Sequence, residues 1–323
     1  MPRTTAPINR LIAARRMEWI AEKTIMMTAM IAIISIILIF LFIGRKALPV
    51  LTDERVRRTA NVEEFFTRNG RSPDGKPAFV WQPISERPKY SFIPLIVGTF
   101  KATAIAMLVA TPLALLGAIY TTEYAPPRLR ERVKPAIESL AAVPSVVLGF
   151  FALVVMASWV QKVLRLETRL NALVAGIALG LAIIPIIYTV AEDSLSAAPR
   201  ALREASLALG ATRAQTLLRV TLPAALPGVF AGIVLGFGRA VGETMIVLMA
   251  SGNAATVSWN PADPIRAMAA TIAAELAEVV YGSAHYHVLF AIGALLFIVT
   301  FVLNFIGDRI IDRLNTRLKG GAE

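Results

Sequence analysis

The chain has 323 residues, of which 56% are hydrophobic and 17% charged, and its mean hydropathy is +0.63. Soluble domains are about 45–50% apolar and about 25% charged, so this composition excludes a disordered chain and argues against an ordinary soluble enzyme. The sequence contains no cysteine, which excludes disulfides, thiolate catalysis and cysteine-ligated metals. The net charge of +11 fits either nucleic acid or basic loops beside an anionic membrane, and the positions of the charges must decide.

Six charge-poor runs are long enough to cross a bilayer, which takes about 20 helical residues. In chain order they are Thr24–Gly44, Ala102–Thr122, Ser139–Gln161, Leu170–Ala191, Val220–Gly238 and Val288–Gly307. Because unpaired backbone groups are costly in lipid, these runs predict an all-α polytopic membrane protein with six transmembrane helices. The first run is longer than a signal-peptide core and lacks a small-residue cleavage site, so we expect it to be retained.

The basic residues flank these runs, and their distribution predicts that the N-terminus and the C-terminus are both cytoplasmic. The exception is the expected extracytoplasmic loop 45–90, which carries ten Lys or Arg residues and six acidic residues. The predicted organisation is a cytoplasmic segment 1–23, a first helix 24–44, the loop 45–90, a five-helix core 91–310 and a cytoplasmic tail 311–323. Since no contiguous basic face is evident, we expect no nucleic-acid partner.

One segment, Gly70–Pro77, matches the start of a phosphate-binding loop, G-x-x-x-x-G-K. Pro77 occupies the position where Ser or Thr would bind Mg²⁺, and no buried strand precedes the segment. We therefore expect this chain to bind no ATP and no Mg²⁺, which would instead bind on a separate ATPase subunit. His285 and His287 lack further nearby ligands, so we also expect no metal site.

The inner loop 192–222 shows the signals of two short helices. Pro199 favours the start of a helix over Arg200–Leu209, and Gly210 favours its end. Thr212 and Gln215 form the pattern of a capping box that opens a second helix, which Pro223 would end. The alternatives are an amphipathic connector lying on lipid, or a helix-turn-helix reader that its two flanking membrane helices would keep out of a DNA groove.

The sequence Glu204-Ala205-Ser206-x₃-Gly210, followed by Leu222-Pro223, resembles the EAA loop of ABC-importer permeases. Ser206 departs from the alanine of that motif. The resemblance implies a coupling helix that docks into a cleft of a cytoplasmic ATPase. The coupling-loop residues would be Arg203, Glu204, Ala205, Ser206 and Gly210.

The fifth run ends in G-R-A-V-G-E-T-M, which contains Arg239, Glu243 and Thr244. Arg239 and Glu243 are four residues apart, so on a helix they would share one face and pair. An arginine at membrane depth costs about 2.5–3.5 kcal/mol on insertion scales, and such residues usually face a bundle interior or a water-filled path. The planar guanidinium suits an oxyanion. The alternative is a structural ion pair that locks two helices.

The stretch Gly238–Asn253 resembles the same stretch of phosphate-importer permeases of the PstC type. Three further stretches agree with it: Gly98–Phe100, Thr121–Pro126 and Val143–Phe150. The resemblance implies a type I ABC importer permease fold and a transport subunit without enzymatic activity. That subunit would pass phosphate by alternating access, with Arg239, Glu243 and Thr244 in the substrate pathway.

The same resemblance implies partners and a location. The partners would be a second, PstA-like permease, two PstB-like ATPase subunits and a PstS-like phosphate-binding protein, in a bacterial or archaeal cytoplasmic membrane. Three other functions stay open: a permease of the same fold for sulfate, molybdate or phosphonate, a stand-alone secondary transporter, and a membrane-embedded enzyme.

Overall fold

The computed structural model describes residues 8–71 and 75–320, with side chains described for 17–71 and 75–316. The ends of the expected segments 1–23 and 311–323, and the middle of the Gly70–Pro77 motif, lie outside the described residues. On either side of that gap, β1 (Gly70–Arg71) and β2 (Pro77–Ala78) pair as an antiparallel hairpin. A second hairpin joins β3 (Trp81–Gln82) to β4 (Lys89–Tyr90).

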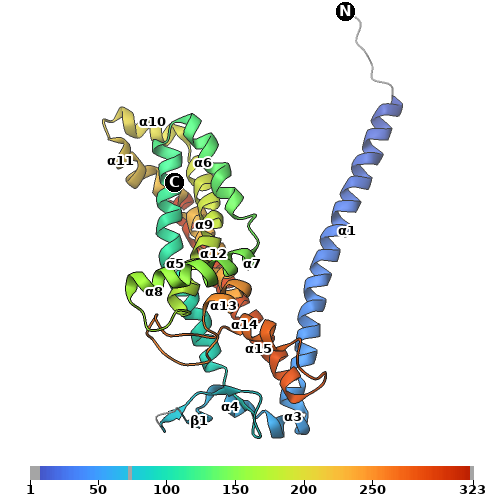
Figure 1. Ribbon diagram of the computed structural model, residues 1–323. Helices are drawn as coiled ribbons and strands as arrows, with labels where there is room; N and C mark the ends of the chain where they lie inside the picture. Colours follow the sequence, from blue (N-terminus) through green and yellow to red (C-terminus); the bar gives the residue numbers. More distant parts are fainter. Residues whose placement is uncertain (1–7, 72–74, 321–323) are drawn as a thin grey trace, which may run out of the picture.

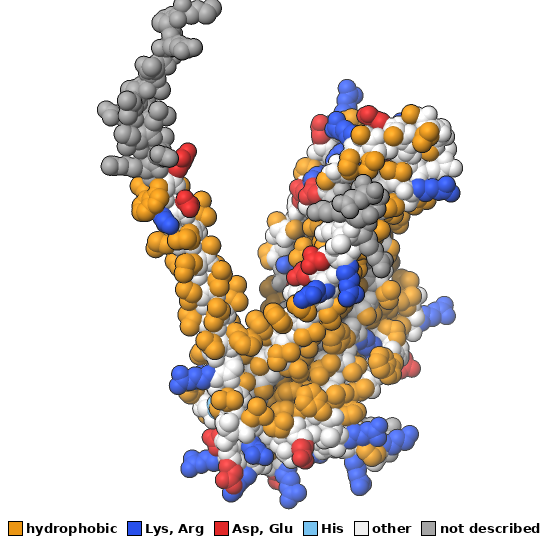
Figure 2. All heavy atoms as spheres, turned by 180° about the vertical axis from the view of Figure 1, so that it is seen from behind, with side chains coloured by type: hydrophobic (Ala, Val, Ile, Leu, Met, Phe, Trp, Pro, Cys, Tyr) orange, Lys and Arg blue, Asp and Glu red, His pale blue; other side chains and the backbone are white. Residues whose placement is uncertain are grey.

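Within the described residues, six helical segments are long and apolar enough to cross a membrane, so the expected all-α fold with six transmembrane helices is confirmed. They are Met17–Thr52, Ile93–Tyr124, Ser145–Leu164, Ala172–Ala197, Arg213–Gly242 and Ala284–Thr316. Hydrophobic side chains cover much of the described part of the first helix and a broad band of the bundle, and many of the Lys and Arg side chains lie at the two ends, with a few at mid-height (Figure 2). The apolar excess of the composition therefore lies on the lipid-facing surface as well as in the core.

Three helices form the centre of the bundle: α5 (Ile93–Ile119), α9 (Ala172–Ala197) and α12 (Leu222–Gly242) (Figure 1). Small residues let them approach closely, as is usual inside membranes. Buried alanines recur every fourth residue along α5, at positions 102, 106, 110, 114 and 118. On α9, a Cβ at Gly176 would lie 2.5 Å from the Ile105 side chain, so a larger residue there would push α5 away.

The helix α1 (Ile8–Ala47) diverges from the bundle over most of its length (Figure 1). The C-terminal end of α1 approaches α15 (Ala284–Gly320), and there the rings of Phe40 and Phe297 lie 5.0 Å apart. Just beyond, the Lys46 ammonium donates a hydrogen bond to the Tyr281 hydroxyl at 2.7 Å. The α1 helix begins well before the expected residue 24 and is one continuous rod.

The segment between α1 and α5 folds into a small layer, here called the outer cap (residues 49–92) after the extracytoplasmic side on which the sequence predicts it. It contains α2 (Pro49–Thr52), α3 (Glu54–Thr59), α4 (Val62–Phe66) and the two hairpins. Asp53 and Asn61 cap α3 and α4 by accepting hydrogen bonds from backbone N–H groups. The buried cap residues Val50, Phe65, Trp81 and Phe92 pack with Leu289 and Ile292 of α15 in one apolar cluster.

The third span differs from the expected single run Ser139–Gln161. The chain forms α6 (Pro127–Leu140), breaks at residues 141–144, and continues as α7 (Ser145–Phe151), η2 (Ala152–Met156) and α8 (Ala157–Leu164). Pro144 stands at the N-cap of α7 with φ −57° and ψ 137°. Because a proline disfavours helical geometry in the residue before it, the charge-free run is divided at this point.

The expected end of the inner helix at Pro223 is wrong. After α11 (Arg213–Thr216), the π-helical turn η3 (Leu217–Thr221) leads directly into α12. The Leu222 N–H donates to the Leu217 carbonyl, one residue further back than in an α-helix. Pro223 is the second residue of α12, directly after the wider π-helical turn, and it does not end the helix.

Candidate transport pathway and coupling site

The helix α12 ends where the sequence places the candidate pathway residues. Arg239 lies in its last turn and is exposed, and the helix stops at Gly242. Glu243 is the C-cap residue with extended geometry, φ −68° and ψ 129°, and Thr244 precedes the next helix, α13 (Met245–Ala250). The three candidate residues therefore surround a break in a membrane helix, which is tolerated where the backbone is buried in protein or lines a water-filled path.

The expected pairing of Arg239 with Glu243 is wrong, because the two residues are not on one helix. Among the described side chains, neither takes part in an ion pair. The Glu243 Oε1 atom instead lies 3.5 Å from the Ile246 N–H, at the start of α13. The Arg239 guanidinium is thus available at the surface of this single chain, and the alternative of a helix-locking ion pair loses its geometric basis.

The rest of the PstC-like stretch positions α13 against the bundle. A Cβ at Gly149 of α7 would lie 3.1 Å from the Met245 carbonyl, so this glycine permits close contact between α7 and α13. After α13, Gly252 and Asn253 turn the chain with positive φ angles of 79° and 51°. The Asn253 side-chain amide donates to the Leu248 carbonyl at 3.1 Å and so closes the end of α13.

In the loop 192–222, the first helix and the capping box form as the sequence predicts, although the second helix runs on past Pro223. The helix α10 spans Arg200–Ala208, Gly210 follows it with φ +86°, and Thr212 and Gln215 form a complete capping box. The loop lies at one end of the bundle, beside the start of α6 (Figure 1). Glu204 and Ala205 are exposed, and so are three leucines: Leu202 at 50%, Leu207 at 42% and Leu209 at 90%. These exposed leucines make the loop a candidate surface for a partner or for lipid.

Arg203 differs from the other coupling-loop residues because its side chain is bound within the chain. Its Nη2 atom lies 2.8 Å from the Glu123 Oε1 atom, and the two side chains are 28% and 10% exposed. Glu123 belongs to η1 (Tyr120–Tyr124), the π-helical extension of α5. The ion pair therefore joins the inner loop directly to a central helix of the bundle.

Ser206, the departure from the E-A-A pattern, also makes a contact within the chain. Its Oγ atom lies 3.0 Å from the Thr216 Oγ1 atom, so a hydroxyl–hydroxyl bond holds α10 against the last turn of α11. An alanine could not make this bond. The sequence offered one signal for this contact: a serine with a hydroxyl group stands where the motif has an alanine.

A buried carboxylate near the C-terminal end of α9 was not identified from the sequence. Glu192 is 0% exposed; Arg130 contacts its Oε1 atom, and the Lys134 ammonium lies 2.7 Å from its Oε2 atom. Lys134 also lies 2.7 Å from Asp193, and hydrogen bonds with Asp193 and Glu192 raise the pKa of Lys134 above its ordinary value. The i, i+4 spacing of Arg130 and Lys134 was a usable signal, because it puts both cations on one face of α6.

Residues 110–320 match the family described as "Binding-protein-dependent transport system inner membrane component". The chain belongs to this family. It is a multi-pass membrane permease, a transport subunit rather than an enzyme, and this confirms the expected fold.

Relatives and solved structures agree with this family. "Probable ABC transporter permease protein YqgH" of Bacillus subtilis is 33% identical over 299 residues, covering 91% of this chain and 92% of the relative. "Phosphate transport system permease protein PstC" of Mesorhizobium japonicum is 33% identical over 256 residues, covering 73% of this chain and 77% of the relative. These matches confirm the resemblance to PstC-type permeases.

Among solved structures, one chain of a bacterial ABC transporter that imports the acidic polysaccharide alginate superimposes with a TM-score of 0.61. It is 15% identical and covers 94% of this chain and 99% of that chain. A chain of the MetNI methionine ABC transporter, in an inward-facing conformation, superimposes with a TM-score of 0.55 at 21% identity. The superposition covers 69% of this chain and 97% of the MetNI chain. At these identities the comparison supports the fold alone.

Proposed function

We propose that this permease is the channel-forming subunit of an ATP-driven phosphate importer in a bacterial or archaeal cytoplasmic membrane. The observation that carries the proposal is its similarity to relatives named as phosphate transport permeases of the PstC type. The exposed Arg239 at the break after α12 supports it, because a guanidinium donates hydrogen bonds in a planar fork that suits an oxyanion.

The proposed mechanism is alternating access. A phosphate-loaded, PstS-like binding protein docks at the outer cap, and two PstB-like ATPase subunits hold ATP and Mg²⁺ and close against α10. The motion passes through the Arg203–Glu123 pair to α5, and the helices tilt. Phosphate then passes Arg239, Glu243 and Thr244 along a pathway completed by a PstA-like permease, whose matching surface would cover the exposed Arg239.

In the proposed orientation, α10 and both termini are cytoplasmic and the outer cap is extracytoplasmic. The described N-terminal end of α1 lies at the same end of the molecule as α10 and α11, opposite the outer cap (Figure 1). This arrangement is consistent with the predicted cytoplasmic N-terminus.

The second candidate is a permease of the same fold for sulfate, molybdate or phosphonate. A guanidinium attracts each of these oxyanions, so Arg239 does not separate them by charge. The solved structures of the same fold include importers of alginate and of methionine, which shows that the fold does not fix the substrate.

The deciding experiment measures uptake of labelled phosphate into proteoliposomes that contain this permease and its partners. ATP-dependent uptake that excess sulfate does not inhibit would support the proposal, whereas uptake that sulfate abolishes would favour the second candidate. Uptake without the ATPase subunits would instead indicate a stand-alone transporter.

The same assay tests the pathway assignment. Arg239→Gln should abolish most uptake, while Arg165→Gln, at an exposed arginine just after α8, should preserve it. Unchanged uptake in Arg239→Gln would remove this residue from the pathway.

A further inference from the structure

The Glu275 carboxylate, at the end of α14 (Met268–Glu275), lies where four parts of the chain meet. Its Oε1 atom accepts a hydrogen bond from the Trp81 Nε1–H of the outer cap at 3.1 Å and lies 2.6 Å from the Arg266 Nη2 atom. Its Oε2 atom lies 3.2 Å from the His285 Nε2 atom, at the start of α15. The Arg266 and His285 side chains are each 18% exposed and that of Glu275 is 15% exposed, so salt screens these contacts little.

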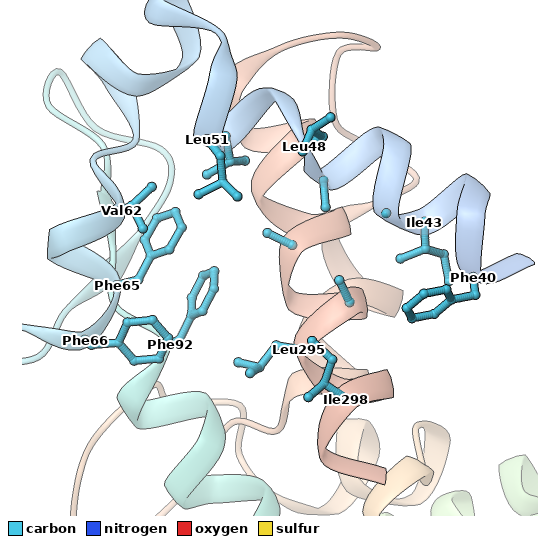
Figure 3. Close-up of a pocket in the computed structure, with 15 residues that line it drawn as sticks. Phe40, Ile43, Leu48, Leu51, Val62, Phe65, Phe66, Phe92, Leu295 and Ile298 are labelled. Carbon is cyan, nitrogen blue, oxygen red and sulfur yellow. The ribbon is translucent and has the colours of Figure 1, made fainter. Parts of the chain in front are cut away.

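The Trp81–Glu275 bond fixes how the outer cap is oriented on the segment that follows α13. Within the described residues, it is the one hydrogen bond between the cap and residues 251–283. The cluster that packs the cap against α15 is apolar, and between the cap and α1 an open space remains, with Phe66 and Phe40 on opposite sides of it (Figure 3). Apolar packing has no preferred direction, whereas a hydrogen bond does.

Arg266 connects this carboxylate to the candidate pathway. The preceding residue, Ile265, donates its N–H to the Ser251 carbonyl at 3.0 Å and pairs with Gly252 in an isolated parallel bridge. Ser251 is the C-cap residue of α13, the helix that follows the break after α12, and both Ser251 and Ile265 are buried. A continuous series of contacts therefore runs from the outer cap, through Glu275 and Arg266, to the end of α13.

We propose that Glu275 is a positioning residue that transmits the position of the outer cap to α13. Energetic coupling between distant sites travels through packed side chains, hydrogen bonds and ion pairs, and each non-covalent step of this series is a hydrogen bond or an ion pair. When a partner docks on the cap and shifts β3, the Trp81–Glu275 bond moves the Arg266 segment and the end of α13 with it. The partner's identity, an extracytoplasmic binding protein, rests on the proposed function, whereas the contacts involve this chain alone.

The first test needs no partner and measures amide hydrogen exchange in the full-length permease in nanodiscs. Trp81→Phe removes the indole N–H and keeps an aromatic ring in the apolar cluster. It should speed exchange of the Ile265 amide by on the order of tenfold, the effect of losing one hydrogen bond to a charged group. Tyr90→Phe is the matched control, because Tyr90 belongs to the same cluster and makes no side-chain hydrogen bond among the described residues.

Faster exchange at Ile265 in Trp81→Phe alone would support the proposal. Wild-type exchange in Trp81→Phe would overturn it, because the cap would then not influence the end of α13. Equally fast exchange in both variants would also overturn it, since general loosening of the cap would be enough to cause the change.

The second test measures ATP hydrolysis by the assembled importer as the loaded binding protein is titrated. Trp81→Phe interrupts the series on the cap side, and Glu275→Gln weakens it on the Arg266 side. Both should lower the maximal stimulation by on the order of tenfold, within the range of coupling free energies, with the half-saturating concentration of binding protein close to that of the wild type. Glu275→Asp keeps the charge and should retain part of the stimulation.

The shape of the titration separates transmission from docking. An unchanged maximum with a raised half-saturating concentration in Trp81→Phe would place Trp81 in the docking surface and overturn the proposal. Wild-type stimulation by a sulfate-loaded but not by a phosphate-loaded binding protein would contradict the proposed function, while the same variants titrated with that protein would still test Glu275. If no binding protein stimulates the wild type, the exchange at Ile265 decides the role of Glu275 by itself.

Discussion

At the scale of single residues, the structure explains why position 98, the first residue of the PstC-like Gly98-Thr99 pair in α5, is a glycine. A Cβ at Gly98 would lie 2.3 Å from the Arg266 carbonyl oxygen, which is backbone and cannot move aside cheaply. The neighbouring Thr99 Oγ1 accepts a hydrogen bond from the Met268 N–H at 2.9 Å. Together they clamp the chain before α14 (Met268–Glu275) onto α5.

Gly98→Ala should therefore destabilise the permease by about 1–3 kcal/mol, the usual cost of overpacking. The thermal midpoint in detergent, followed by size-exclusion chromatography, measures this effect. Gly117→Ala in the same helix is the control, because its Cβ would meet Tyr188 at an ordinary 3.4 Å. Equal midpoints for the two variants would show that the segment around Arg266 adapts.

Tyr90 of the outer cap gives a prediction about pH. Its side chain is 2% exposed, and burial, together with the Glu275 carboxylate, raises the pKa of Tyr90 to about 12 from 10.0. The unfolded chain loses this proton at lower pH than the folded one, so the stabilising effect is complete below pH 10 and is lost as pH rises toward 12.

Thermal midpoints measured across this pH range should fall less steeply for Tyr90→Phe than for the wild type. Tyr281→Phe is the control. The hydrogen bond from Lys46 lowers the pKa of the exposed Tyr281, so this tyrosine affects the pH dependence of stability in the opposite direction to Tyr90. A slope that Tyr90→Phe leaves unchanged would show that Tyr90 does not stay protonated.

At the scale of elements, the Arg203–Glu123 pair is the described ion pair that joins α10 to the end of α5. If this pair passes motion between them, Arg203→Glu and Glu123→Arg should each lower ATP-dependent uptake by on the order of tenfold, within the usual range of coupling free energies. The double charge swap should restore part of the activity.

The control for the charge swap is Glu138→Arg, at an exposed residue of α6 that makes no ion pair among the described side chains. ATP hydrolysis measured in parallel separates lost coupling from lost assembly: uncoupled hydrolysis would persist without uptake. A double variant no more active than either single variant would contradict a direct role for the pair.

The elements also show how far sequence reasoning reached. The caps of α10 and α11 were predictable because Gly210, Thr212 and Gln215 act on their own backbone neighbours. The break after Gly242 was not, because Arg239 and Glu243 fit a continuous helix equally well. It is the packing of α13 against α7 that sets the direction of the chain there.

At the scale of the whole molecule, the Glu192 cluster ties α6 to the central helix α9. Glu192→Gln should cost about 1.5–3 kcal/mol, the range for hydrogen bonds to charged groups, because the two cations lose a fully buried carboxylate. Asp193→Asn is the matched control: Asp193 is adjacent but 61% exposed, so its loss should have a small effect.

Thermal midpoints of the two variants, compared with the wild type, measure the difference. If both variants lower the thermal midpoint by a similar small amount, the favourable energy of the buried ion pair is offset by the cost of desolvating its charges, as happens for some buried ion pairs.

The presence of six apolar spans and the caps of the two short helices in the loop 192–222 follow from local sequence, because bilayer thickness sets the length of a span and capping signals act on neighbouring residues. Tertiary structure alone decided which charges meet. Glu192 binds cations on α6, Arg203 binds Glu123 across 80 residues, and Arg239 remains at the surface beside a broken helix. These contacts depend on how helices distant in the sequence pack. Rotating a helix by one residue, about 100°, would turn its charged side chain away from the present partner.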